Sequence, residues 1–155
     1  MYKSTLAIAL ATATLQAHAL GFSAGIGNMF GGLATQSGAQ ASADSVDQVL
    51  QSLSAELNKK MPMKADANTR LDRVSAEPGR HFTYHYTVDS TSALNGVPVD
   101  FSKEIKPQLK NQLCSNPDNQ KFLKNGITIA YQYRDKNGHD IGDAEFTPKD
   151  CGFQT

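Results

Sequence analysis

Two stretches of alternating residues constrain the fold of this 155-residue chain more than any other feature. They read HFTYHYTVDS at 81–90 and ITIAYQYRDK at 127–136, and each contains a Tyr-x-Tyr unit. Alternate side chains of a β-strand lie on the same face, so each stretch predicts a strand with one aromatic, apolar face. The chain is therefore expected to form a sheet with helices packed against one side.

Each alternating stretch has a neighbour with which it can form a hairpin. Residues 69–76 predict a strand that Pro78-Gly79 joins to the strand at 81–89. Asn137-Gly138 is a strong two-residue hairpin signal, and it predicts a returning strand that ends near Thr147. The sequence thus predicts about four antiparallel strands in two hairpins.

A helix is predicted over residues 45–60, because apolar residues fall at i, i+3, i+4, i+7 and i+11 on one helical face. Pro62 ends this pattern. The apolar residues of the face are Val46, Val49, Leu50, Leu53 and Leu57.

Helical sequence returns between the hairpins, from about Asp100. Pro107 interrupts its apolar pattern, which predicts either a kink or a helix that begins near Lys106. A short helix is then expected from Pro117, with Asn116 as its N-cap. The order α-β-β-α-β-β predicts an α+β domain, with an antiparallel sheet of about four strands and helices packed on one face.

Residues 1–19 have the layout of a secretory signal peptide. Lys3 precedes an apolar run at 6–15, and Ala17-His18-Ala19 is a small-x-small cleavage site. The run is too short to span a bilayer, and no later segment is long enough. We therefore expect export to the periplasm or secretion, with a buried N-terminal helix as the alternative.

Residues 20–43 hold six of the twelve glycines and no charged residue. They predict a flexible Gly/Ala/Ser-rich linker ahead of a single α+β domain at residues 44–155. The alternative is a weak amphipathic segment that docks on a partner, because five apolar residues have nearly helical spacing. They are Phe22, Ile26, Met29, Phe30 and Leu33.

The two cysteines, Cys114 and Cys151, predict a disulfide in an exported chain. The loop between them would stabilise the domain by roughly 4 kcal/mol on chain-entropy arithmetic. The charges balance, with 15 basic and 15 acidic residues, so the chain lacks the excess positive charge typical of nucleic-acid binding. Nucleic acid is therefore not an expected partner.

The aromatic rows permit two interpretations. If the strands are neighbours, their tyrosines form cross-strand pairs that pack under the helices as core, with hydroxyl groups at the wet margin. Alternatively, the rows form a flat surface that docks a protein, glycan or peptide. The candidate binding residues are Tyr84, Tyr86, Tyr131 and Tyr133.

No catalytic residue, metal site or cofactor site is predicted. His81 and His85 would lie about 13 Å apart along one strand, too far to share a metal ion. The oxygen side chains of residues 135–140 lack the spacing and distal glutamate of an EF-hand, so they indicate a hairpin turn. A hydrolase that uses either histidine is a third, less favoured alternative.

Several features of residues 57–151 occur together: Met-Pro before TRLD, the two Tyr-x-Tyr strands, Cys114 before a short helix, Asn137-Gly138 and the terminal Asp150-Cys151. In these features the chain resembles small exported bacterial proteins of uncharacterised function. The resemblance implies export and the disulfide, and it implies no activity.

These observations together predict an exported, non-enzymatic protein. We expect it to be a protein-binding or inhibitory module of the bacterial envelope, with an unknown protein partner. The alternative is a periplasmic binder of a small ligand that uses an aromatic pocket.

Overall fold

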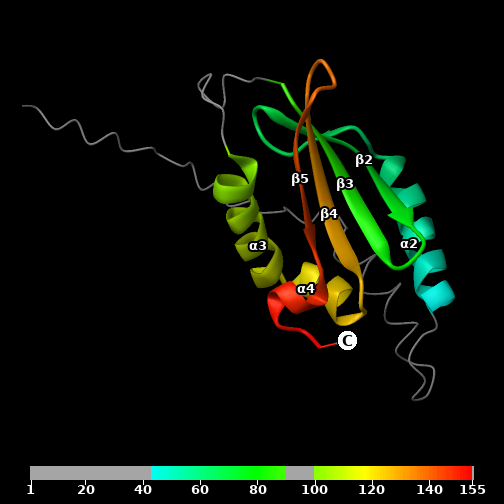
Figure 1. The fold of residues 1–155 in the computed structure, drawn as a ribbon. Helices are drawn as coiled ribbons and strands as arrows, with labels where there is room; N and C mark the ends of the chain where they lie inside the picture. The colour runs from blue at the N-terminus through cyan, green and yellow to red at the C-terminus, as the bar shows by residue number, and fades with distance from the viewer. Residues whose placement is uncertain (1–42, 90–99, 155) are drawn as a thin grey trace, which may run out of the picture.

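The structure is a computed structural model that describes residues 43–89 and 100–154 (Figure 1). The predicted signal peptide lies outside the described residues, and so does the predicted linker except for Ala43. The described residues form an α+β fold with a five-stranded mixed sheet, which confirms the predicted class and corrects its details.

The five strands lie in the sheet in the order in which they occur along the chain. All neighbouring pairs are antiparallel except β3 and β4, which are parallel. The strands are β1 Met63–Lys64, β2 Thr69–Glu77, β3 His81–Val88, β4 Thr128–Asp135 and β5 Asp140–Phe146.

The prediction of four strands, all antiparallel, was wrong on both points. Each hairpin is antiparallel as expected, but the helical segment between them returns the chain to the end of the sheet where β3 begins. Parallel neighbours require such a crossover, and a hairpin signal says nothing about how one hairpin is oriented against the next. The fifth strand, β1, has only two residues and therefore no alternation to detect.

The described helices lie close to their predicted positions. The first is α2, Ala43–Asn58, and a π-helical turn, η2 Phe101–Ile105, leads directly into α3, Lys106–Ser115. Pro107 therefore lies in the first turn of α3, one of the two predicted outcomes. The remaining elements are α4 Pro117–Lys124, whose N-cap is Asn116, and the 3-10 helix η3 Pro148–Cys151.

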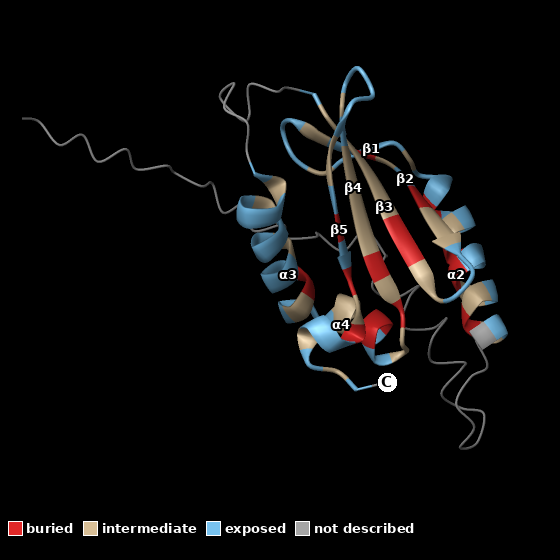
Figure 2. Ribbon diagram, viewed as in Figure 1, coloured by how far each residue is buried: buried red, intermediate tan, exposed pale blue. Residues whose placement is uncertain are grey.

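One face of the sheet carries the core, together with residues from α2, α3 and α4. Figure 1 shows α2 beside β2, α3 beside β5, and α4 at the end where β4 begins. Figure 2 shows buried residues concentrated towards this α4 end of the strands. The largest fully buried side chains are Phe82, Phe122, Phe146, Leu50, Leu113, Leu123, Ile127 and Ile129.

Two side chains of α2 hold the helix against β2. The Asn58 amide donates to the carbonyl of Val74 at 2.8 Å and accepts from its N–H at 2.8 Å. The carboxylate of Asp47 accepts from the N–H groups of Gly79 and Arg80, at 3.0 and 2.7 Å. These hydrogen bonds fix the N-terminal end of α2 at the β2–β3 turn and its C-terminal end at the middle of β2.

A disulfide joins Cys114, near the end of α3, to Cys151 in η3, with 5.3 Å between the Cα atoms. The disulfide expected from the cysteine count is thus present. It connects the crossover helices to the segment that follows the last strand.

Candidate functional site

The parallel register of β3 and β4 brings the two Tyr-x-Tyr units together. Tyr84 is the direct partner of Tyr131, and Tyr86 is the direct partner of Tyr133. The cross-strand aromatic pairs expected from the sequence therefore form. We call the surface made by these four residues the tyrosine face.

The four rings are stacked almost in parallel. The ring centroids of Tyr84 and Tyr131 lie 5.4 Å apart with 15° between their planes, and those of Tyr86 and Tyr133 lie 5.0 Å apart with 11°. The neighbours along β3 also stack, at 6.5 Å. Because strands hold each ring from a rigid backbone, the surface is preorganised.

Burial changes steadily across three rows of paired residues on this side of the sheet. The row Phe82, Ile129 and Phe146 is completely buried, with at most 1% of each residue exposed. In the next row the two tyrosines are partly buried, between Val74 and Ala144. The last row runs Met63, Leu71, Tyr86, Tyr133 and Gly142.

The last row includes the most exposed large apolar side chain in the described part of the chain, Met63, which is 43% exposed. The difference between the rows follows from the helices. Phe122 of α4 packs against the first row, with its ring centroid 5.7 Å from that of Phe82, and the next residue, Leu123, is also buried. The tyrosine face thus extends the core towards solvent at the opposite end of the sheet from α4.

Phe101 of η2 forms one border of the tyrosine face, a contact that sequence reasoning missed. Its ring centroid lies 5.5 Å from that of Tyr133. Gly142 makes room for it, because a Cβ at that position would lie only 2.5 Å from Phe101 Cγ. The signal available in the sequence was a glycine within a predicted strand, which often marks a position that another group approaches closely.

Burial raises the pKa of all four phenols. It raises the pKa of Tyr86 to about 12, with a smaller contribution from the negative charge of Asp66. The pKa of Tyr84, Tyr131 and Tyr133 is also raised by burial, and next by neighbouring tyrosines. Tyrosine is already uncharged at physiological pH, and the raised pKa values keep the face uncharged to a higher pH, which suits contact with apolar or polar uncharged groups.

The opposite face of the sheet is polar and contains a contact that the sequence analysis did not predict. Ser75 Oγ and His85 Nε2 lie 2.8 Å apart across β2 and β3. Burial, followed by the positive charge of Arg73, lowers the pKa of His85, and Gln132 is its other hydrogen-bonding neighbour. Both Gln132 and the negative charge of Glu77 act in the opposite direction and raise this pKa.

The loop at residues 135–140 forms the predicted hairpin turn. Asp135 Oδ1 accepts from the N–H groups of Asn137 and His139, both at 2.8 Å, and Oδ2 lies 2.9 Å from His139 Nδ1. The pKa of Asp135 is lowered to about 2, mainly by its side-chain hydrogen bond with His139. Within residues 43–89 and 100–154, no cluster of three metal-ligating side chains occurs.

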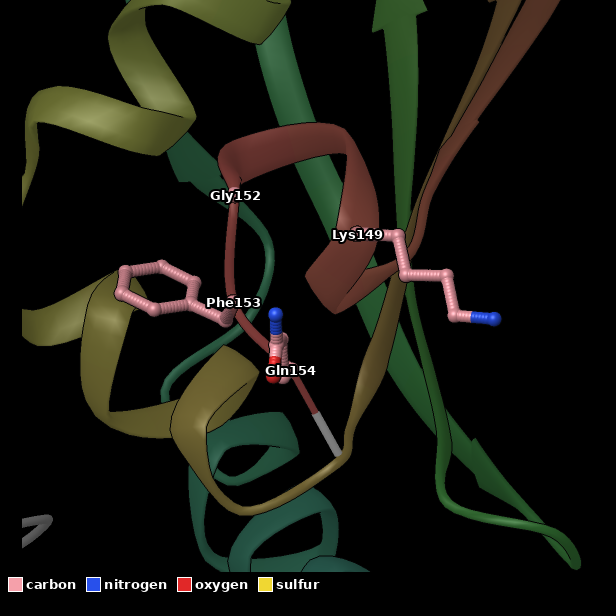
Figure 3. Close-up of a pocket in the computed structure, with 4 residues that line it drawn as sticks. All are labelled: Lys149, Gly152, Phe153 and Gln154. Atoms are coloured by element: carbon pink, nitrogen blue, oxygen red, sulfur yellow. The ribbon is translucent and has the colours of Figure 1, made fainter.

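A hollow of about 490 Å³ lies at the C-terminal tail (Figure 3). It is lined by Lys149, Gly152, Phe153 and Gln154. None of the four tyrosines borders it. Among the described helices, none has the length and apolar character needed to cross a membrane.

A profile of a family described as a domain of unknown function, DUF8479, matches residues 45–141. The chain belongs to this family. The DUF8479 match covers the tyrosine face and Cys114, and it ends before Cys151. No curated protein matches the chain.

Three solved structures share the fold. A candidate secreted protein from Pseudomonas aeruginosa is 18% identical, with a TM-score of 0.61 over 74% of this chain and 99% of that one. The type 2 secretion system pilotin EpsS from Vibrio vulnificus is 16% identical, with a TM-score of 0.59 over 72% and 96%. The type II secretion system pilotin AspS from Vibrio cholerae is 18% identical, with a TM-score of 0.56 over 70% and 94%.

Proposed function

We propose that this member of the DUF8479 family is an exported, non-enzymatic protein of the bacterial envelope whose tyrosine face binds a partner protein. The burial gradient carries the proposal. Four stacked rings continue a fully buried core, yet they remain partly exposed, and their outer row continues through Leu71 to the exposed Met63.

The chemistry of the face suits a protein partner. Tyrosine gives a large contact area and has few rotatable bonds to immobilise, so it binds at a low entropic cost. The phenols are neutral at physiological pH, and burial raises the pKa of each of them further. An apolar segment would cover the rings, and the hydroxyl groups at the margin would hydrogen-bond to its backbone.

The solved structures support the envelope location. Two are named as secretion-system pilotins and the third as a candidate secreted protein. The predicted signal peptide at residues 1–19 points to the same compartment. A small-ligand carrier is less well supported, because none of the four tyrosines borders the hollow at the C-terminal tail.

Site-specific photocrosslinking in cells that export the protein tests the proposal. The photoreactive residue p-benzoylphenylalanine replaces Tyr133 in one variant and Gln132 in the other. These positions are adjacent on β4 and lie on opposite faces of the sheet, so they form a matched pair. We expect one protein to be crosslinked from position 133 and not from position 132.

A second variant separates binding from folding. Tyr86→Ser removes one ring from the face, and circular dichroism verifies that the variant remains folded. We expect crosslinking of the same partner from position 133 to fall. Equal crosslinking yields from positions 132 and 133, or no crosslinked partner from position 133, would contradict a docking role for the tyrosine face.

A further inference from the structure

We propose that residues 22–33 of this chain dock on the tyrosine face of the same molecule and compete there with a partner. The inference rests on the proposed docking role of that face. It assigns a role to the one apolar pattern of the sequence that the fold and the proposed function leave unused.

The chemistry of the segment matches the face. Residues 20–43 carry no charge, so docking would desolvate no ionised side chain of the segment. As a helix, the five apolar residues would share one side over about 16 Å. On β3, Tyr84 and Tyr86 lie about 7 Å apart, so a helix of this length would extend past both tyrosine rows. The five residues are Phe22, Ile26, Met29, Phe30 and Leu33.

The segment is attached at the end of the sheet where β3 begins, and the tyrosine face lies further along β3. α2 begins at Ala43, and Asp47 in its first turns is bonded to the N–H groups of Gly79 and Arg80, directly before β3. Along β3, Tyr84 lies about 13 Å beyond Arg80, and Tyr86 lies about 20 Å beyond it.

The intervening chain is long enough to cover this distance. Nine residues lie between Leu33 and Ala43, and the ten steps along this chain span about 16–19 Å on average and about 33 Å when extended. A tether of this kind gives an effective concentration in the millimolar range, so even weak docking would be populated. A partner would then have to displace the segment, which lowers its apparent affinity.

Intramolecular photocrosslinking in residues 20–155 tests the inference. With p-benzoylphenylalanine in place of Phe30, we expect crosslinks to peptides of β3 and β4 that contain the four tyrosines, at the mass of a monomer. The matched control carries the same residue in place of Gln40, in the same segment but outside the apolar pattern. Equal yields from positions 30 and 40, or crosslinked dimers, would overturn the inference.

A second experiment measures competition and separates the two proposals. The partner crosslink from Tyr133 is compared between the unaltered chain and a Phe22→Ser, Phe30→Ser variant. A segment that is docked half of the time halves the available face, so the variant should roughly double the partner yield. An unchanged yield would contradict competition.

The two experiments can refute the two proposals separately. Crosslinks from Phe30 to the face without any partner from Tyr133 would support the intramolecular docking and refute the partner-binding function. A partner from Tyr133 without crosslinks from Phe30 would do the reverse.

Discussion

The four stacked tyrosines predict that the protein loses stability at alkaline pH. Burial raises the pKa of Tyr86 from its ordinary 10.0 to about 12. In the unfolded chain the phenol ionises near its ordinary pKa, whereas the folded protein holds its proton longer. The associated stability is therefore complete below pH 10 and is lost as the pH rises towards 12.

The magnitude follows from the size of the shift. Each pKa unit corresponds to about 1.4 kcal/mol, so at pH 11 the contribution lost from Tyr86 is about 1.4 kcal/mol. The pKa of each of the other three tyrosines is also raised by burial, so their contributions have the same sign. At pH 11 the four tyrosines together should therefore lower the free energy of unfolding by roughly several kcal/mol.

Urea unfolding at pH 9 and pH 11, followed by circular dichroism, measures this loss. Tyr86→Phe removes one titrating group, so its free energy of unfolding should fall by about 1.4 kcal/mol less than that of the unaltered protein. Absorbance at 295 nm reports phenolate formation, and all tyrosines of residues 20–155 belong to the tyrosine face. Equal losses in both proteins, or ionisation of the folded face near pH 10, would refute the reasoning.

Two further predictions concern the scaffold. Asn58→Ala removes both hydrogen bonds to the backbone of β2, so it should lower the free energy of unfolding in urea titrations by about 1–3 kcal/mol. In the control, Asn111→Ala at an exposed position, the free energy of unfolding should change by less than about 0.5 kcal/mol. Replacing Cys114 and Cys151 together by serine should lower the free energy of unfolding by about 4 kcal/mol, and reduction of the disulfide in the unaltered protein should lower it equally. A decrease of less than about 1 kcal/mol would count against the disulfide as a main source of stability.

The candidate site was predicted from the sequence in its residues but not in its exposure. Alternation around the two Tyr-x-Tyr units placed all four tyrosines on strand faces, and the structure pairs them directly. Periodicity cannot tell how far the helices reach along the sheet, so both interpretations, core and surface, were open. The fold shows that α4 packs against the Phe82 row and that the tyrosine rows lie beyond it.

Other features depend on contacts between segments that are distant in the sequence. Phe101 packs against Tyr133 because Gly142 of a third element leaves space for its ring. The hydrogen bond between Ser75 and His85 depends on the register of β2 against β3. A glycine within a strand can indicate that another group approaches closely, but a single sequence does not show which distant residue that group belongs to.

The sequence by itself determined the local elements of this protein, because helical periodicity, strand alternation and turn chemistry act over a few residues. The positions of α2, α4 and the two hairpins followed from such signals. Only the tertiary structure decided that the hairpins meet through parallel β3 and β4, because this pairing depends on the crossover between them. That pairing stacks the four tyrosines and creates the face on which the proposed function rests.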